Sequence, residues 1–280
     1  MPRAHPHPLA LFSLAPINER AKAVVAHPIN DPFVSTLDDG THALDIGHIK
    51  KSCNTTLVTL GRGDADIFVE GSSIAKIQCS FEIDLDTNVV MFYDRSHGQT
   101  TQVYGERATP FEYGRLRKVV VQKKLNSIIG MGGEGRDLVQ FKLEWHQNPV
   151  QTMDKIRNRQ NISLGYEENP RFARTIIDEA DTVLPSQRGT RIHTPGTRQL
   201  KMRYVTIGDM LGAGQFGEVY KAVDVDSGKL MAVKILELPD GATRKQRDDW
   251  KESVYYALKR EVENLAKINH VSKTTSNLSR

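Results

Sequence analysis

Short apolar runs alternate with polar turns along the first half of the chain. In 77–83 the apolar residues Ile77, Cys79, Phe81 and Ile83 recur at every second position, the period of a β-strand with one buried face. Similar runs predict strands at Leu9–Leu14, Ala43–Ile46, Thr56–Leu60, Ile67–Val69, Val89–Tyr93, Thr101–Tyr104, Val119–Val121 and Leu138–Trp145. Turn-forming residues separate these runs at 38–40, 84–88 and 130–133. Many short strands at this spacing favour a β-sandwich.

The alternation is lost between residues 148 and 203. This stretch is rich in Pro, Arg, Asp and Glu and poor in aromatic residues, and Ile156 and Ile162 indicate only a short helix. Such a composition is typical of a linker. Its basic residues are spaced rather than clustered, so we expect a solvated segment; a role in nuclear import or nucleic-acid contact is the alternative.

From Tyr204 the apolar pattern returns. It predicts three antiparallel strands, at 204–211, 218–226 and 229–236, with a hairpin turn at Asp226–Gly228. A helix is then predicted from Thr243 to Asn269, because Val254 and Leu258 begin an apolar series at helical spacing.

Composition and charge change this picture little. With 280 residues, 39% hydrophobic and 26% charged, the chain has room for two modest soluble domains. A net charge of +4 does not argue for nucleic acid, so no direct nucleic-acid partner is expected. No apolar run approaches the roughly 20 residues that span a bilayer, so neither a membrane partner nor a signal peptide is expected. Two cysteines, Cys53 and Cys79, and nine scattered histidines predict no disulfide framework and no metal site, and indicate a nuclear or cytoplasmic protein.

Three glycines at 212, 214 and 217 form a G-x-G-x-x-G motif. By itself the motif is compatible with a dinucleotide site, a lid over a nucleotide, or a chance cluster. A dinucleotide site needs a helix directly after the glycines, whereas 218–225 alternates and is β-branched like a strand. A strand, glycine loop and second strand are typical of the flap that covers ATP phosphates.

Two charged residues accompany this loop. Lys234 lies in the apolar run 232–235; an edge or snorkelling lysine is the alternative. Glu261 shares a predicted helix face with Leu258 and Leu265, where a carboxylate needs a partner, and Lys234 is the expected one. The alternatives are that Glu261 lies on the helix surface, or that Glu263 is the carboxylate.

With these motifs, residues 204–270 resemble the N-lobe of a eukaryotic Ser/Thr protein kinase. The resemblance implies ATP binding by residues Leu211, Gly212, Gly214, Gly217, Val219, Ala232, Lys234 and Glu261. The family's catalytic aspartate and magnesium ligands come later than Arg280, and 271–280 form an atypical polar tail. We therefore expect no catalytic residue and no metal site in this chain, ATP binding that is weak or confined to a longer form, and Mg only with the missing C-lobe. Unaided, the chain is not expected to transfer a phosphoryl group.

The order of Leu60–Arg62, Lys76–Gln78 and Asp94–Gly105 resembles the forkhead-associated (FHA) domain over residues 8–147. That domain is a β-sandwich whose loops bind phosphothreonine. The resemblance implies a phosphothreonine-containing partner protein, bound by residues Arg62, Ser73, Lys76 and Gln99. A fixed guanidinium suits a phosphate dianion, and the family's phosphate arginine corresponds to Arg62; an ordinary surface arginine is the alternative.

Three positions depart from the FHA pattern. The contacting serine corresponds to Ala75, the structural histidine to Gln78 and the loop asparagine to Gln99. Ser73 and Lys76 are near enough in sequence to substitute. A working phosphopeptide reader and a scaffold that docks without phosphate therefore both stay open.

The expected fold is mainly β with an α+β part: an FHA-like β-sandwich at 8–147, a linker at 148–203, and a partial kinase N-lobe of three antiparallel strands and one helix at 204–270. An FHA domain ahead of a Ser/Thr kinase is the layout of checkpoint effector kinases, which implies a nuclear role after DNA damage. The expected function is phosphopeptide docking joined to the ATP-binding part of a Ser/Thr kinase. The alternative is a fragment of an active, ATP-dependent checkpoint-type kinase.

Overall fold

The computed structural model describes residues 2–48, 55–105, 107–111, 117–133, 135–158, 204–214, 216–236, 241 and 243–275. The chain divides into two compact units. The first unit comprises Met1–Gly208 and Ala222–Met231, and the second comprises Asp209–Lys221 and Ala232–Arg280. Most of the predicted linker, residues 159–203, lies outside the described residues, as do Cys53 and the last five residues of the polar tail, 276–280.

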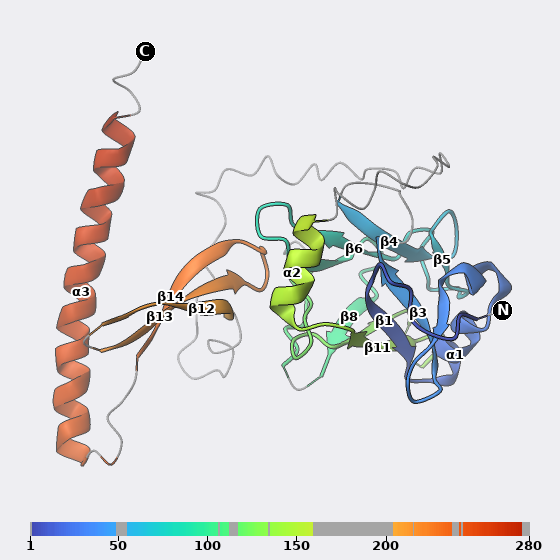
Figure 1. Cartoon of the computed structure of the whole chain (residues 1–280), viewed down its shortest axis with the longest axis horizontal. Coiled ribbons are helices and arrows are strands. Elements are labelled where there is room, and N and C mark those ends of the chain that lie inside the picture. Colours follow the sequence, from blue (N-terminus) through green and yellow to red (C-terminus); the bar gives the residue numbers. More distant parts are fainter. Residues whose placement is uncertain are drawn as a thin grey trace. The chain divides into compact units, whose positions relative to one another are not determined.

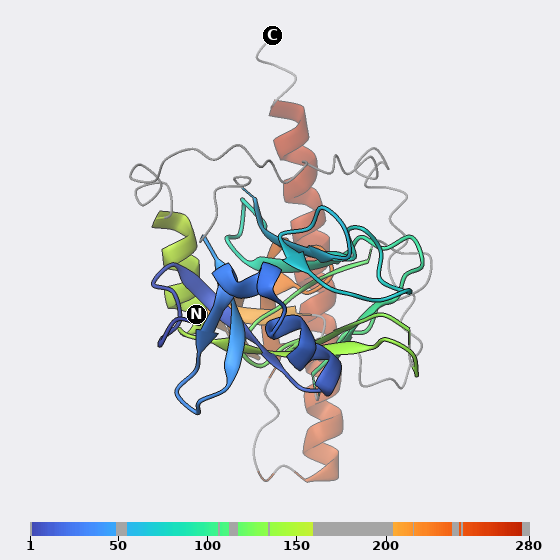
Figure 2. The same cartoon turned by 90° about the vertical axis from the view of Figure 1, so that its right-hand side faces the viewer.

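Two β-sheets packed face to face make up most of the first unit (Figure 1). One sheet has the strand order β2-β3-β1-β11-β10-β8, and the other β5-β4-β6-β7-β9. The strands are β1 (Ala10–Pro16), β2 (Val34–Thr36), β3 (His42–Gly47), β4 (Thr56–Gly61), β5 (Ile67–Phe68), β6 (Cys79–Ile83), β7 (Val90–Asp94), β8 (Thr101–Tyr104), β9 (Lys118–Val120), β10 (Ile128–Met131) and β11 (Val139–Trp145). Helices α1 (Glu19–Val25) and α2 (Pro149–Arg157) and the 3-10 helix η1 (Pro28–Phe33) also belong to this unit (Figure 2). The chain is mainly β, as predicted.

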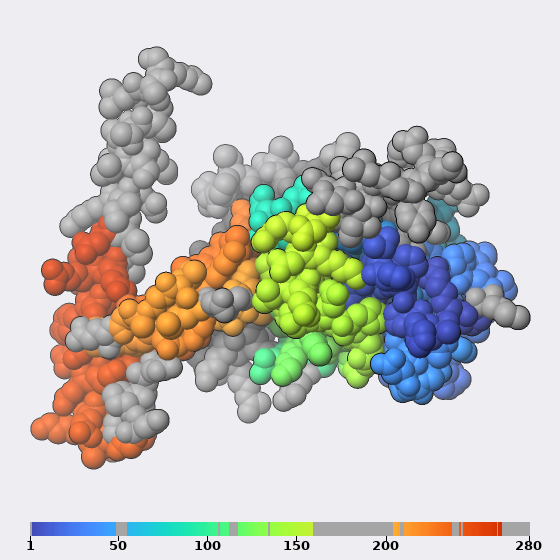
Figure 3. Space-filling model, viewed as in Figure 1, coloured from blue at the N-terminus to red at the C-terminus, as the bar shows by residue number. Residues whose placement is uncertain are grey.

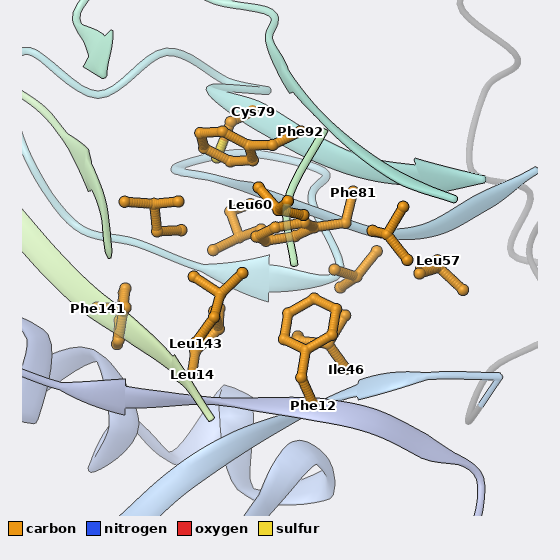
Figure 4. Close-up of a cluster of buried hydrophobic side chains, with 14 of the residues drawn as sticks. Phe12, Leu14, Ile46, Leu57, Leu60, Cys79, Phe81, Phe92, Phe141 and Leu143 are labelled. Carbon is orange, nitrogen blue, oxygen red and sulfur yellow. The ribbon is translucent and has the colours of Figure 1, made fainter. Parts of the chain in front are cut away.

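The core lies between the two sheets (Figure 4). Phe12 of β1 meets Phe81 of β6 edge to face, with ring centroids 5.1 Å apart. Phe81 in turn contacts Phe92 of β7 at 4.9 Å. These three side chains are fully buried. Because β1 and β6 belong to opposite sheets, the alternating apolar residues of each strand fill one common layer, which is the arrangement of a sandwich.

Each predicted strand of this unit coincides with an observed strand to within about two residues, but the predicted turn at 130–133 is wrong at its first half. Gly130 and Met131 belong to β10, which pairs with both β8 and β11. A Cβ atom on Gly130 would lie 2.7 Å from Cε2 of Tyr104, so glycine here makes room for a ring rather than a turn. The strand β2 and the helix α1 were also missed.

The folded body extends on both sides of the predicted range 8–147. At the start, the Arg3 amide donates to Val34 O at 3.1 Å, which adds the N-terminal segment to the sheet edge. At the end, Lys155 of α2 donates to Pro8 O at 2.7 Å and to Ala10 O at 2.8 Å. Figure 3 shows α2, in lime, beside the dark-blue N-terminal segment on the surface. Ile156 of α2 is buried, so this helix is part of the sandwich domain.

A buried carboxylate ties the N-terminal segment to three strands. Asp45 of β3 is fully buried and accepts hydrogen bonds from the hydroxyls of Ser13 and Ser35, both at 2.7 Å. Its second oxygen accepts from the His7 amide at 2.7 Å and lies 3.6 Å from Nη1 of Arg3. A charge taken out of water is tolerated only with such a set of partners.

The C-terminal part contains a three-stranded sheet in the order β12-β13-β14 and one long helix. The bounds are β12 (Tyr204–Gly214), β13 (Gly217–Asp224), β14 (Leu230–Leu236) and α3 (Arg244–Thr275). The turn after β13 closes with Gly228 N donating to Asp224 O at 2.9 Å, in the predicted place. Thr243 precedes α3 and exchanges hydrogen bonds with Gln246, at 2.9 and 3.4 Å, as an N-terminal cap does. Among the described helices, none is long and apolar enough to cross a membrane.

Candidate functional site

The predicted phosphate arginine sits on a loop whose backbone is fixed. Arg62 follows β4, its side chain is exposed, and its amide donates to Ala75 O at 3.0 Å. Gly63 N donates to Lys76 O at 3.2 Å. A Cβ atom on Gly61 would lie 2.1 Å from Lys76 O, so this close approach of two backbones requires glycine at 61. The structure thus joins the loop of Arg62 to the loop of Lys76, and both side chains are exposed.

Gln78 is fully buried beneath these loops. Its Oε1 accepts from the Ala75 amide at 2.8 Å, and its Nε2 donates to Thr100 Oγ1 at 2.9 Å and Thr101 Oγ1 at 2.8 Å. The alternation in 77–83 predicted one buried strand face, yet Gln78 and Ser80, which point to the other face, are buried as well. The loops cover that face and supply the partners that a buried amide needs.

Ser73, predicted to contact phosphate, is engaged elsewhere. Its hydroxyl hydrogen-bonds Asp137, its amide donates to the same carboxylate at 2.8 Å, and its oxygen accepts from Gly133 N at 2.6 Å. Burial acts to raise the pKa of Asp137, but the hydrogen bonds from Ser73 and Gly133 outweigh it and lower this pKa to about 2. Since the Ser73 hydroxyl donates its hydrogen to Asp137, Ser73 joins two loops rather than offering a donor to phosphate.

Gln99, the predicted peptide-contacting residue, is exposed at the tip of the loop between β7 and β8. Its φ is 51°, in the left-handed region. Arg117 holds this loop: it donates to Gln99 O at 2.9 Å, to Thr101 O at 2.6 Å and to Asp94 at 2.6 Å. No sequence pattern singled out Arg117, because its partners come from a different segment.

Arg95, directly after β7, does not present its charge on this face. Its side chain is only 10% exposed and pairs with Glu82 at 2.6 Å. Its charge is therefore largely neutralised within the sandwich, because burial strengthens the attraction between the partners. The described face offers Arg62, Lys76 and Gln99 as exposed side chains.

The predicted nucleotide residues lie in the second unit. Lys234 Nζ lies 2.7 Å from Glu261 Oε1, so the expected partners are in contact. The side chain of Lys234 is 22% exposed and that of Glu261 52%. The expectation that Glu261 faces inward along an apolar stripe is therefore wrong. The side chains of Leu265 and Ile268, on which that stripe depended, lie outside the described residues. An ion pair this exposed contributes little stability.

The three glycines have different surroundings. A Cβ atom on Gly212 would meet nothing within 4 Å, and one on Gly214 would lie 3.9 Å from Lys234 Nζ. Gly217 has φ 147°, and its Cβ would lie 1.9 Å from Ile235 O. Gly217 is thus required by the fold of the hairpin, whereas Gly212 and Gly214 leave open space, and the space at Gly214 lies beside an ammonium group.

This arrangement fits a nucleotide phosphate. Open backbone at two glycines and one lysine ammonium are the groups that hold phosphate oxygens in such loops. Leu211 and Ala232 are exposed and Val219 is half-buried, so apolar surface is available beside the loop for a base. Among the described residues, no group of three or more His, Cys, Asp or Glu side chains gathers as a metal site would require.

A surface depression lies elsewhere in the first unit. Its lining includes Asn88, Val121, Trp145 and Met153, and none of the predicted site residues. The candidate binding residues of the sandwich therefore lie on exposed loops rather than in a cavity.

Comparison with known proteins identifies one part of the chain. No family model matches it. A stretch of 63 residues is 41% identical to the mitogen-activated protein kinase kinase kinase MST11 of Pyricularia oryzae, over 22% of this chain and 7% of that protein. Over this stretch the chain is similar to a protein kinase kinase kinase. A solved structure of Rad53 in complex with AMP-PNP aligns with a TM-score of 0.33 and 13% identity, over 67% of this chain and 37% of that chain. The chain therefore spans less than a tenth of the length of the curated relative and little more than a third of the solved chain.

Proposed function

We propose that this kinase-related chain is a signalling protein that docks on phosphothreonine-containing proteins through an FHA-like sandwich. The observation that carries the proposal is the exposed Arg62, whose backbone is fixed by the Ala75 carbonyl while its guanidinium is free to meet a ligand. A phosphothreonine brings about two negative charges and three acceptor oxygens, which suit an arginine and a neighbouring lysine. Lys76 lies on the adjoining loop, and Gln99 is available for the peptide backbone. Ser73 is left out of this contact set, because its hydroxyl binds Asp137.

The location that goes with this proposal is nuclear or cytoplasmic, and the layout favours a DNA-damage checkpoint pathway. Both rest on the resemblance to checkpoint effector kinases. Neither a membrane nor a nucleic acid is needed as a partner, since the recognised group is a phosphorylated side chain of another protein.

Arg62→Ala is expected to weaken the binding of phosphothreonine peptides by about 10- to 100-fold. A hydrogen bond to a charged group contributes about 1.5–3 kcal/mol, and 1.4 kcal/mol corresponds to about a factor of ten in Kd. Isothermal titration calorimetry with a panel of phosphothreonine peptides and their unphosphorylated forms measures this. Arg157→Ala is the matched control, because it removes one exposed arginine from α2. Equal loss in both variants, or equal binding of unphosphorylated peptides, would remove the docking role.

A second function is proposed for the C-terminal part: that it is the ATP-binding portion of a Ser/Thr protein kinase. The specific observation in its favour is the contact between Lys234 and Glu261 close to the open glycine positions. In this role Gly212 and Gly214 present their backbone to the phosphates, and the Glu261 carboxylate directs the Lys234 ammonium toward them. Mg would accompany the lobe that carries the metal ligands.

Lys234→Met is expected to abolish phosphoryl transfer in a longer form that contains a complete catalytic lobe. The methionine keeps the apolar stem but removes the positive charge that holds the phosphates, and the loss of one such group costs about 10²- to 10³-fold in kcat. Transfer of radiolabelled phosphate to a generic protein substrate measures it. Lys229→Met, in the exposed turn before β14, is the control. Retained activity in Lys234→Met would refute this assignment.

A further inference from the structure

Gln78 uses the full hydrogen-bonding capacity of its amide nitrogen inside the first unit. Both Nε2 hydrogens are donated, to Thr100 Oγ1 and Thr101 Oγ1, and Oε1 accepts from the Ala75 amide. The hydroxyls have their own acceptors: Thr101 Oγ1 lies 3.5 Å from Gln78 O, and Thr100 Oγ1 lies 3.4 Å from Ser73 O. Each threonine hydroxyl therefore donates to a carbonyl and accepts from Gln78 Nε2. The Gln78 carboxamide is the group to which both hydroxyls and the Ala75 amide are hydrogen-bonded.

The Gln78 carboxamide is linked to Arg62 through one residue, Ala75. The backbone of Ala75 is held on both sides of its Cα, because its N–H donates to Gln78 Oε1 at 2.8 Å and its carbonyl accepts from Arg62 N at 3.0 Å. A shift of the Gln78 side chain would move the Ala75 backbone and, with it, the point from which Arg62 projects.

The Gln78 side chain is also hydrogen-bonded to the loop between β7 and β8, which in turn contacts the loop between β10 and β11. Thr100 directly follows Gln99, and the Thr100 carbonyl accepts from Gly132 N at 3.1 Å at the start of the loop between β10 and β11. Gln78 therefore joins three segments that are distant in sequence: the loop of Arg62 and Ala75, the loop of Gln99, and the loop that begins at Gly132.

We propose that Gln78 is a positioning residue for phosphopeptide docking, which sets Arg62 and the Gln99 loop in their relative places without touching the peptide. This inference rests on the proposed docking function. Since Gln78 is fully buried, its effect on a ligand is exerted through Ala75 and Thr100. Binding residues lose much of their affinity for a ligand when the residues that support them allow displacements of about 1 Å.

Three substitutions of Gln78 test its hydrogen bonds to Ala75 and to the two threonine hydroxyls. Gln78→Leu keeps much of the volume but leaves the Ala75 amide and both threonine hydroxyls without their partner. Gln78→Glu places an oxygen where Nε2 stood, so both hydroxyls must turn away from their carbonyl acceptors. Gln78→His retains one acceptor and one donor, so it can hold Ala75 and one threonine together.

The experiment uses the full 280-residue chain. Calorimetry at 10 °C measures the affinity for a phosphothreonine peptide, amide hydrogen exchange measures the opening of Ala75 and Thr100, and thermal unfolding measures the stability of each variant. Gln78→Leu and Gln78→Glu are expected to bind at least about 10-fold more weakly and to exchange faster at both amides, while Gln78→His stays within about threefold of wild type. Ile129→Val, at a fully buried position of β10, is the control: it lowers stability but leaves affinity unchanged.

Thr100→Val keeps the test decisive if the Gln78 variants fail to fold, because it removes a single hydroxyl from a half-buried position. It is expected to weaken binding about threefold and to speed exchange only within 95–101. Wild-type affinity in Gln78→Leu, unchanged exchange at Ala75, or a loss in Gln78→His as large as in Gln78→Leu would overturn the inference. If wild type binds no phosphothreonine peptide, the proposed function fails, while exchange at Ala75 and Thr100 still decides whether Gln78 holds the loops.

Discussion

Asp45→Ala is expected to destabilise the sandwich domain by about 3–5 kcal/mol, the cost of removing one partner from a buried, hydrogen-bonded charged cluster. The carboxylate is fully buried and receives hydrogen bonds from Ser13, Ser35 and the His7 amide, each at 2.7 Å. Alanine takes away the acceptor that these three donors share, and among the described residues only the Ser13 hydroxyl has a second partner, His146 Nε2 at 2.9 Å. It also removes the counter-charge of Arg3, so the N-terminal segment loses its attachment to β3.

Urea unfolding of wild type and Asp45→Ala, followed by tryptophan fluorescence, measures the change in the free energy of unfolding. Asp38→Ala is the control, since Asp38 is exposed on the turn before β3 and its loss is expected to change stability by less than about 0.5 kcal/mol. Removal of residues 2–7 is expected to destabilise in the same direction as Asp45→Ala, because it deletes Arg3 and His7 together. An Asp45→Ala variant as stable as Asp38→Ala would show that the cluster does not support the fold.

Gly61→Ala is expected to combine a large loss of stability with a loss of phosphopeptide binding. The added Cβ atom would lie 2.1 Å from Lys76 O and 2.8 Å from Lys76 C, and backbone atoms cannot yield as the end of a flexible side chain can. The strand end and the 75–76 segment must separate, which strains or breaks the hydrogen bonds from Arg62 N and Gly63 N. Overpacking of this kind costs about 1–3 kcal/mol or more, and the displaced Arg62 is expected to lower affinity at least about 10-fold.

The measurement pairs thermal unfolding with calorimetric titration of a phosphothreonine peptide. Gly98→Ala is the matched control in the loop between β7 and β8, because its Cβ would make only an ordinary contact, at 3.6 Å from Thr100 Cγ2. Unchanged unfolding and unchanged affinity in Gly61→Ala would mean that the two loops do not approach as closely as the structure has them.

The sequence predicted strands well where a strand carries a short apolar run between turn-forming residues. The period-two alternation in β6 and the apolar runs of β1, β4 and β7 are local properties, so neighbouring residues suffice to recognise them. The elements that were missed lack a strong local signal. β10 contains a glycine and was taken for a turn, and α1 is a seven-residue helix whose cap, Asn18, is defined by a bond from the Ala21 amide.

Some residues of the candidate sites were likewise recognised from the sequence, and others only from the structure. The glycine spacing, Lys234 and Glu261 were recognised from sequence, since their order along the chain carries the pattern, and the structure adds their 2.7 Å contact. The role of Glu261 in a buried stripe was wrong, because exposure depends on what packs against the helix. In the sandwich, the sequence indicated Arg62 and Lys76 as binding residues. Gln78 was noted only as a departure from the structural histidine of the FHA family.

By itself, the sequence determined the mainly β character of the chain, the positions of most strands and the glycine-loop hairpin, since each depends on residues within a few positions of one another. Only the tertiary structure decided that Asp45 is buried, that Ser73 is committed to Asp137 across 64 residues, and that Gln78 joins loops 22 and 23 residues away. Hydrogen-bond partners of buried polar groups come from whichever segments the fold brings together, and no local periodicity records that choice.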